Sequence, residues 1–213
     1  MKNGYDFLRD LNLKKDSVVF HIGAYGDITK SIRNNVTEDC KIYCFDGDAE
    51  NVKRKKEEIG EIANIIQNYP SNIDSTLPFY VIKSESNQDL YFSSLKKPRC
   101  LINFYPDVKM EESEAGVIRI DDYSNKFEIV NFIWCDVNGA EIDFIDSSKK
   151  TLEKTEYILL KFSNHGLYHG QKTLNEIEES LGRNFRRLDL TGMTDYALFE
   201  NIDLHQNGIS ETG

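Results

Sequence analysis

Residues 130–145, VNFIWCDVNGAEIDFI, are the stretch that most narrows the choice of fold. They begin with a run of apolar residues, pass through an Asn-Gly turn, and continue with Ile142 and Ile145 at helical spacing. Continuous apolar runs are typical of strands that are buried on both faces of a sheet. The sequence therefore predicts a strand over residues 130–137 and a helix over residues 140–152, the repeating unit of a parallel α/β sheet.

Short apolar runs and amphipathic helical patterns alternate through the rest of the chain. A helix is predicted from Ala49 with Asp48 as its N-cap, and another starts at a capping box of Thr173 and Glu176 and stops before Gly182. The buried face of the first helix is predicted to carry Val52, Ile59, Ile62, Ile66 and Tyr69. Further strands are predicted over residues 17–22, 41–45, 79–82, 89–92, 100–104, 157–162, 185–190 and 196–199.

The last two apolar runs are separated only by residues 191–195, which suits an antiparallel hairpin and is too short for a crossover. We therefore expect an α/β protein with the Rossmann-like fold of class I methyltransferases. This fold has a mostly parallel seven-stranded sheet, helices on both faces and a C-terminal antiparallel hairpin. No repeat or linker interrupts the order of elements, so residues 1–213 are predicted to form a single domain with a core of about residues 16–201.

The composition excludes several classes of function. A hydrophobic content of 39%, with 12 Phe and 11 Tyr among 213 residues, is too high for a disordered chain. The net charge of −10 argues against a nucleic-acid protein with a broad basic face. No apolar run approaches the length of a membrane helix, and the N-terminus lacks the apolar stretch of a signal peptide. We expect a cytoplasmic protein without a nucleic-acid or membrane partner.

Two local patterns favour structural interpretations. The basic run at residues 53–56 is followed by Glu57 and Glu58, which is typical of a solvated helix face. The cysteines form no CxxC pair and have no histidine at metal-ligand spacing, so they are predicted to be buried reduced thiols and no metal site is assigned. These cysteines are Cys40, Cys44, Cys100 and Cys135.

The first candidate site is the turn that follows the strand at residues 17–22. Gly23 and Gly26 form a GxxG pattern, which permits a tight turn and a close approach of a ligand to the backbone. The pattern lacks the GxGxxG spacing of a pyrophosphate loop, and a plain strand-to-helix turn is the alternative. Asp46 stands 23 positions after Gly23, where a carboxylate can accept both hydroxyls of an adenosine ribose. Its alternatives are a helix-cap neighbour or a solvated turn residue.

The second candidate site is the segment after the strand at residues 130–137. Asp136 is predicted at the carboxyl end of this strand, the edge where open α/β sheets bind ligands. Gly139 permits a close turn into a helix whose first turn carries Glu141. Glu141 is placed either to cap that helix or to act in the site, and both interpretations stay open.

Seven segments occur in one order along the chain: VVFHIGAYGDIT, YCFDGD, VIRIDDY, FIWCDVNGAEIDFI, YILLKFS, GLYHGQKTLNEI and DYALFEN. With these segments the sequence resembles the FkbM family of S-adenosylmethionine-dependent methyltransferases, from about the first strand to Asn201. The resemblance implies methyl transfer from S-adenosylmethionine to an oxygen of a sugar or another small metabolite.

The resemblance also implies roles for individual residues. Asp46 would hold the ribose, Ser84 would lie near the adenine, and Asp136 with Val137 would lie near the methionine part and the reacting methyl group. Asp121 and Asp122 match a stretch expected to be structural or on the substrate side. The loop under the cofactor would comprise His21, Gly23, Ala24, Tyr25 and Gly26.

Two positions depart from the family pattern. His21 stands where the first strand usually ends in an acidic residue, and Lys161 stands where a glutamate is expected after a later strand. Both changes remove negative charge from a cleft that would bind a sulfonium cation. A non-catalytic Rossmann-like domain that has lost its cofactor and serves as a binding or scaffold module is therefore the alternative hypothesis.

O-Methylation requires an in-line arrangement of donor and acceptor and a group that takes the hydroxyl proton. His165 and His169 lie in the predicted loop beside Asp136, and we expect His165 to be the base and His169 to be a loop or substrate contact. Mg²⁺ with Asp136 as one ligand is the alternative. The expected partner is a small-molecule or carbohydrate acceptor, and the oligomeric state stays open, with a homodimer among the alternatives.

Overall fold

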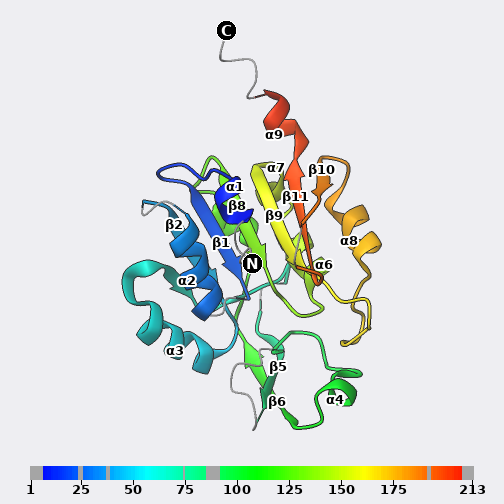
Figure 1. Cartoon of the computed structure of the whole chain (residues 1–213). Helices are drawn as coiled ribbons and strands as arrows, with labels where there is room; N and C mark the ends of the chain where they lie inside the picture. The colour runs from blue at the N-terminus through cyan, green and yellow to red at the C-terminus, as the bar shows by residue number, and fades with distance from the viewer. Residues whose placement is uncertain are drawn as a thin grey trace.

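A seven-stranded sheet forms the centre of the computed structural model, which describes residues 7–23, 26–36, 39–73, 75–84, 92–190 and 193–207 (Figure 1). The strand order is β10-β11-β9-β8-β1-β2-β3. Neighbours from β3 to β9 are parallel, and β11 is antiparallel to both β9 and β10. The strands are β1 (Val18–Ile22), β2 (Lys41–Phe45), β3 (Asn64–Ile66), β8 (Val130–Cys135), β9 (Thr155–Lys161), β10 (Phe185–Leu188) and β11 (Tyr196–Asn201). The predicted parallel sheet with a C-terminal hairpin is confirmed.

Helices cover both faces of this sheet, which explains why its central strands are apolar throughout. On β1, Val19 packs with Leu8 and Ile32 of the first two helices, whereas Phe20 packs with Phe144 on the opposite face. One face is covered by α1 (Phe7–Asp10) and α2 (Gly26–Asn35). The other is covered by α5 (Ile120–Ser124), α6 (Glu141–Ser147), α7 (Lys149–Glu153) and α8 (Leu174–Leu181). The chain also forms α3 (Ala49–Ile59) and α9 (Ile202–Asn207).

A second, smaller layer lies beyond the carboxyl ends of the parallel strands (Figure 1). It contains the antiparallel pair β5 (Leu77–Ser84) and β6 (Val108–Ala115) and the short helix α4 (Leu101–Phe104). The pair β4 (Tyr69–Pro70) and β7 (Val117–Ile118) connects this layer to the sheet. A Cβ on Gly47 would lie 3.0 to 3.2 Å from Ala115, Phe79 and Tyr69. The β5–β6 pair and β4 therefore pack tightly onto the turn after β2.

Two expectations for the first half of the chain are wrong. The helix that begins at Ala49 ends at Ile59, because Gly60 adopts φ +56° and starts the short 3-10 helix η1 (Gly60–Ile62). Ile66 therefore lies in β3 and Tyr69 in β4, not on the face of a helix. The strand predicted over residues 79–82 is present as part of β5, but β5 pairs with β6 outside the seven-stranded sheet.

Two further elements differ from the prediction. Residues 101–104 form α4 instead of a strand. The helix predicted over 140–152 is divided into α6 and α7 at Ser148, whose hydroxyl donates to the carbonyl of Phe144 and whose φ of −131° is not helical. Most of the strand predicted over 89–92 lies outside the described residues.

The basic run was expected to be solvated, and for Lys55 this is wrong because its side chain is fully buried. Cys40, Cys44 and Cys135 are buried free thiols, as predicted, whereas Cys100 is only partly buried. Within the described part of the chain, no helix is long and apolar enough to cross a membrane.

Candidate active site

The ends of β1 and β8 meet at the glycine turn. Gly23 adopts φ +68°, and its amide donates to the carbonyl of Phe45 at 2.9 Å. A Cβ on Gly23 would lie 1.8 Å from the carbonyl oxygen of Asp136, so no other residue fits here. Gly26 begins α2, which confirms a strand–turn–helix arrangement, whereas Ala24 and Tyr25 lie outside the described residues.

Asp136 follows β8 at this edge and is 3% exposed. Its Oδ2 accepts from Nζ of Lys161 at 2.9 Å and from the hydroxyl of Tyr196 at 3.4 Å. Its Oδ1 is buried and has no hydrogen-bond partner among the described residues. Lys161 also lies 3.5 Å from Oδ1 of Asn138. The lysine that departs from the family pattern therefore forms an ion pair with the predicted catalytic aspartate.

Glu141 lies beside this pair at the start of α6. Its Oε1 accepts from the amide of Gly139 at 2.8 Å, as a cap does, but its buried Oε2 has no partner in the part of the chain that the structure describes. Burial raises the pKa of Glu141 to about 7, and the charge of Asp136 adds to this effect, whereas the backbone hydrogen bonds and Lys161 oppose it. Helix capping thus explains the hydrogen bond of Oε1 but not the burial of Oε2.

A small cavity of about 40 Å³ opens next to these acids. Tyr168 forms one wall: it packs against Gly139, where a Cβ would lie 2.8 Å from the Cβ of Tyr168, and its hydroxyl donates to the carbonyl of Phe92 at 2.7 Å. Gln171 accepts from the amide of Tyr168 at 3.2 Å and donates to the carbonyl of Ser163 at 3.0 Å. The cavity is lined by Phe92, Asn138, Gly139, Glu141, Lys161, Phe162, Ser163, Leu167, Tyr168 and Gln171.

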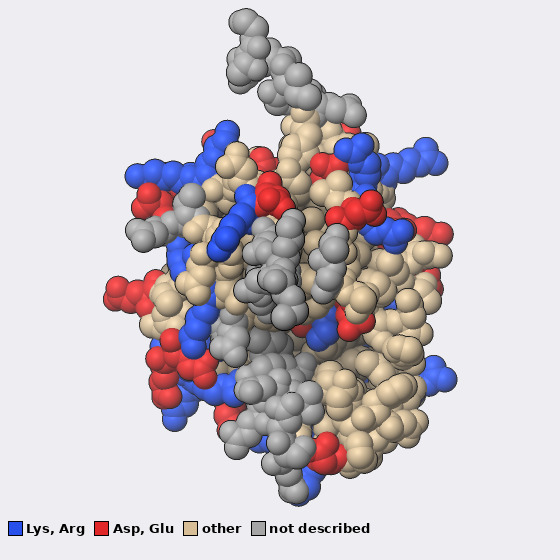
Figure 2. All heavy atoms as spheres, in the orientation of Figure 1, with Lys and Arg blue, Asp and Glu red and all other residues tan. Residues whose placement is uncertain are grey.

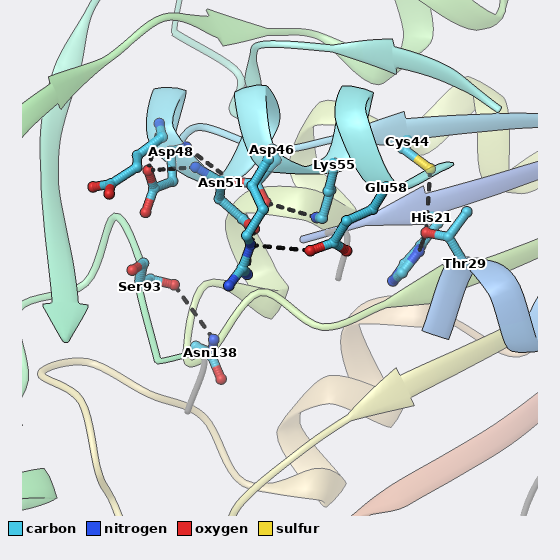
Figure 3. A network of polar contacts seen from close by, with 12 residues as sticks. His21, Thr29, Cys44, Asp46, Asp48, Asn51, Lys55, Glu58, Ser93 and Asn138 are labelled. Atoms are coloured by element: carbon cyan, nitrogen blue, oxygen red, sulfur yellow. Dashed lines mark hydrogen bonds and ion pairs between the residues drawn. The ribbon is translucent and has the colours of Figure 1, made fainter. Parts of the chain in front are cut away.

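Asp46 directly follows β2 and is 3% exposed. Its Oδ2 accepts from Nζ of Lys55 at 3.1 Å and from the side-chain amide of Asn51, and its Oδ1 accepts from the amide of Asp48 at 2.8 Å. Figure 3 shows Lys55 and Asn51 extending from α3 toward this carboxylate. Asp48 is the N-cap of α3, as predicted, since it accepts from the amides of Glu50 and Asn51. The contacts of Lys55 and Asn51 could not be predicted from residue spacing, because they depend on how α3 is rotated against the end of β2.

His21 is fully buried on the face of the sheet that α1 and α2 cover. Its Nδ1 lies 2.9 Å from the hydroxyl of Thr29 in α2 (Figure 3). Its ring lies 6.2 Å from that of Trp134. Burial, assisted by the charge of Lys55, holds the pKa of His21 well below its usual value. The imidazole is therefore neutral at pH 7, and it adds no positive charge to the edge of the sheet.

The remaining predicted residues differ in position. The hydroxyl of Ser84 donates to Oδ2 of Asp107 at 2.6 Å. Ser84 is the last residue of β5 and lies at the opposite end of the β5–β6 pair from Leu77 and Ala115. Val137 is buried, and its carbonyl accepts from the hydroxyls of Tyr69 at 2.6 Å and Ser94 at 3.3 Å. The structure therefore places Ser94, rather than Ser84, against the edge of the sheet.

Both loop histidines are exposed. The ring of His165 lies 5.7 Å from that of Phe104 in α4, and the amide of His169 donates to the carbonyl of Lys97 at 2.9 Å. Asp121 is structural: it accepts from the amide of Thr151 at 2.8 Å and fixes the start of α7. Among the described residues, no group of three or more His, Cys, Asp or Glu side chains is arranged to hold a metal ion.

The sheet topology is that of the Rossmann-like fold of class I methyltransferases. An S-adenosylmethionine-dependent methyltransferase from Aquifex aeolicus superposes with a TM-score of 0.50 at 13% identity, covering 93% of this chain and 87% of that one. An rRNA-methylase candidate from Clostridium thermocellum superposes with a TM-score of 0.55 at 11% identity, covering 95% and 97%. Both similarities concern the fold.

The family follows from the sequence comparison. The model of the methyltransferase FkbM domain matches residues 15–189, and the chain belongs to this family. A relative from Sinorhizobium fredii, the 2-O-methyltransferase NoeI, is 25% identical over 175 residues, which are 79% of this chain and 72% of the relative. S-Adenosylmethionine is the methyl donor that membership of the family implies.

Proposed function

We propose that this protein transfers a methyl group from S-adenosylmethionine to a hydroxyl oxygen of a sugar or a related small metabolite. The observation that carries the proposal is Asp136, a buried carboxylate at the carboxyl edge of a parallel sheet whose Oδ1 has no partner among the residues that the structure describes. This edge is where α/β sheets of this kind bind ligands. The similarity to a 2-O-methyltransferase supports oxygen as the atom that is methylated.

The residues present fit such a cofactor. Oδ1 of Asp136 and Oε2 of Glu141 are buried acceptors without protein partners in the described part of the chain. Buried polar groups are normally hydrogen-bonded, so these two oxygens favour a ligand with cationic or N–H donors. The ammonium and sulfonium groups of S-adenosylmethionine have this chemistry. Gly23 brings the backbone of β1 into contact with Asp136, which leaves no side chain between the turn and the ligand.

Each residue then has a defined task. Asp136 and Val137 hold the methionine part, and Asp46, whose carboxylate Lys55 and Asn51 hold in place, binds the ribose. The cofactor supplies an electrophilic methyl group on a sulfonium, and the thioether that remains leaves without protonation. The protein must therefore align the acceptor and remove its hydroxyl proton. His165 is the proposed base: its exposed imidazole lies in the loop after β9, the loop that also supplies Ser163, Leu167 and Tyr168 to the lining of the cavity.

A second candidate is a scaffold domain without cofactor, and two ion pairs favour it. Lys161 neutralises Asp136, and Lys55 neutralises Asp46, the two carboxylates assigned to the cofactor. In this alternative the family fold is kept while the acidic groups serve stability alone.

Calorimetric titration separates the two candidates. Micromolar affinity for S-adenosylmethionine, about −8 kcal/mol, supports the enzyme, and transfer of a radiolabelled methyl group to a panel of methyl glycosides tests the acceptor. Asp136→Asn should weaken binding, whereas Asp122→Asn, an exposed carboxylate of α5, is the matched control. Absence of binding at millimolar ligand to the folded protein would favour the scaffold.

A further inference from the structure

Two uncharged segments lie against each other beside the cavity. Residues 101–106, LINFYP, and residues 162–171, FSNHGLYHGQ, contain no Lys, Arg, Asp or Glu, in a chain that is 29% charged. Backbone hydrogen bonds next to them hold the segments together, from Arg99 to the carbonyl of Leu167 at 2.7 Å and from His169 to that of Lys97 at 2.9 Å. Figure 2 shows a broad surface free of charged side chains at its lower right, over α4 and the loop after β9 in the orientation of Figure 1.

Aromatic rings connect the cavity to this surface. Phe92 lines the cavity, and its ring lies 4.6 Å from that of Tyr105, the residue that ends α4. The preceding residue, Phe104, is 55% exposed, and its ring lies 5.7 Å from that of His165. Ile102 of the same helix is 59% exposed, so α4 presents two large apolar side chains to solvent beside the site.

The size of the cavity determines where an acceptor must lie. The cavity offers about 40 Å³ to the centre of a water molecule and about 280 Å³ of empty space including its open mouth, so it cannot enclose both the cofactor and an acceptor, because pockets for one small organic ligand measure roughly 300 Å³ or more. A sugar acceptor can therefore place only its reacting edge in the cavity, and its ring must rest on the surface outside. The surface that adjoins the cavity through Phe92 and Tyr105 is the one that carries Phe104 and His165.

We propose that Phe104, with the ring of His165 inclined at 46° beside it, forms a stacking platform that binds the pyranose ring of the acceptor next to the cavity. This inference rests on the proposed function and assigns the acceptor's binding site within it. One face of a pyranose consists of C–H groups and covers an aromatic ring well, while its hydroxyls need polar neutral partners at the edge. Asn164 and the loop backbone offer such partners. Lys97 and Arg99 are exposed, and Nη1 of Arg99 would lie 3.9 Å from a Cβ on Gly166, so one cation borders the platform beside His165.

The test compares Phe104→Ala and Phe104→Trp with Met110→Ala, a control at an apolar residue of β6 that is 46% exposed. Phe104 is exposed, so its replacement should leave the fold and the affinity for S-adenosylmethionine unchanged. With methyl glycosides of glucose, mannose, galactose and fucose as probes, Phe104→Ala should raise KM about tenfold, the loss expected for half-burying an aromatic ring. It should change kcat less than twofold, and Phe104→Trp should retain the wild-type KM.

Saturation-transfer NMR with the same glycosides measures binding without turnover. The platform is supported if the NMR saturation transfer to the sugar ring is lost in Phe104→Ala and retained in Met110→Ala. This holds even where no methylated product is detected. Equal transfer in the wild type and Phe104→Ala overturns the platform but leaves sugar methylation intact, and a wild type that binds no glycoside also overturns it. A concentration-dependent dimer that Phe104→Ala dissolves would assign the surface to a second copy of the chain instead.

Discussion

Nζ of Lys55 lies 3.1 Å from Oδ2 of Asp46, and the two side chains are 0% and 4% exposed. Burial raises the pKa of Asp46, whereas the charge of Lys55 lowers it, so each ion depends on the other. The pair fixes the carboxylate at the end of β2 and joins it to α3.

Removal of the cation should therefore destabilise the fold. Lys55→Met leaves a buried carboxylate without its partner and should lower the free energy of unfolding by about 3–5 kcal/mol, measured by urea denaturation. Lys56→Met, one position along the same helix and exposed, should change it by less than about 0.5 kcal/mol. Adding Asp46→Asn to Lys55→Met should recover part of the loss. Equal effects of the two single substitutions would show that the pair is energetically unimportant.

The two loop histidines allow a matched test of the base. His165→Ala should reduce turnover by about 10²- to 10⁴-fold without altering the affinity for S-adenosylmethionine, because a base acts only on the acceptor proton. His169→Ala, in the same loop and equally exposed, should retain turnover within a few fold. Steady-state kinetics with a methyl glycoside as the acceptor measures the turnover of both variants. Unchanged turnover in His165→Ala would remove it from the proton transfer.

Lys161 should discriminate between the methyl donor and its product, which differ by the sulfonium charge. Lys161→Met removes a cation 2.9 Å from Asp136 and should tighten binding of S-adenosylmethionine relative to S-adenosylhomocysteine by about tenfold. Lys172→Met, which removes an exposed charge paired with Glu176, should leave this ratio unchanged. Calorimetry gives both dissociation constants. An unaltered ratio in Lys161→Met would place the sulfonium away from this lysine.

The glycine turns should differ in their tolerance of a side chain. Gly23→Ala requires a positive φ and places a Cβ 1.8 Å from a backbone oxygen, so the folded protein should be lost or destabilised by more than about 4 kcal/mol. Gly182→Ala has a comparable φ of +85° but no atom within 4 Å, and it should cost only about 1–3 kcal/mol. Denaturant midpoints measure both. A stable Gly23→Ala protein would contradict the close contact between β1 and Asp136.

Glu141 should make the stability of the ligand-free protein depend on pH. Its pKa is raised from 4.5 to about 7 in the folded state, so the folded chain holds this proton more tightly than the unfolded chain. The contribution to stability is full below pH 4.5 and falls by about 3 kcal/mol as pH rises to 7. Glu141→Gln should remove this decline. The measurement compares the free energy of unfolding of the wild type and of Glu141→Gln, plotted against pH from 5 to 8. Parallel curves would show that the group is ionised throughout.

The central strands could be predicted because burial on both faces makes their sequences continuously apolar. β1 and β2 follow this pattern, and the capping box of Thr173 and Glu176 is present at α8. β3 could not be predicted, because three residues carry no periodicity and its isoleucines continue the spacing of the preceding helix. Elements of three or four residues are defined by their neighbours in the fold rather than by their own sequence.

The site was predictable in part for a similar reason. Asp46, Gly23 and Asp136 stand at strand ends, and the positions of strand ends follow from the apolar runs. Their partners do not: Lys55 reaches Asp46 from α3, and Lys161 reaches Asp136 from the next strand, β9. Such contacts depend on how a helix is rotated and on which strands are adjacent, and neither can be determined from residue spacing.

The seven-stranded sheet has its two shortest strands at its edges, β3 with three residues and β10 with four. An edge strand exposes unpaired N–H and C=O groups to any other chain, and the number of such groups grows with its length. β10 also carries the exposed Arg186 and Arg187, which form ion pairs with Glu200 and Glu178 and keep charged side chains at this edge. The sheet is therefore a poor template for amyloid-like growth, and the protein is expected to stay dispersed when it is concentrated or briefly unfolded.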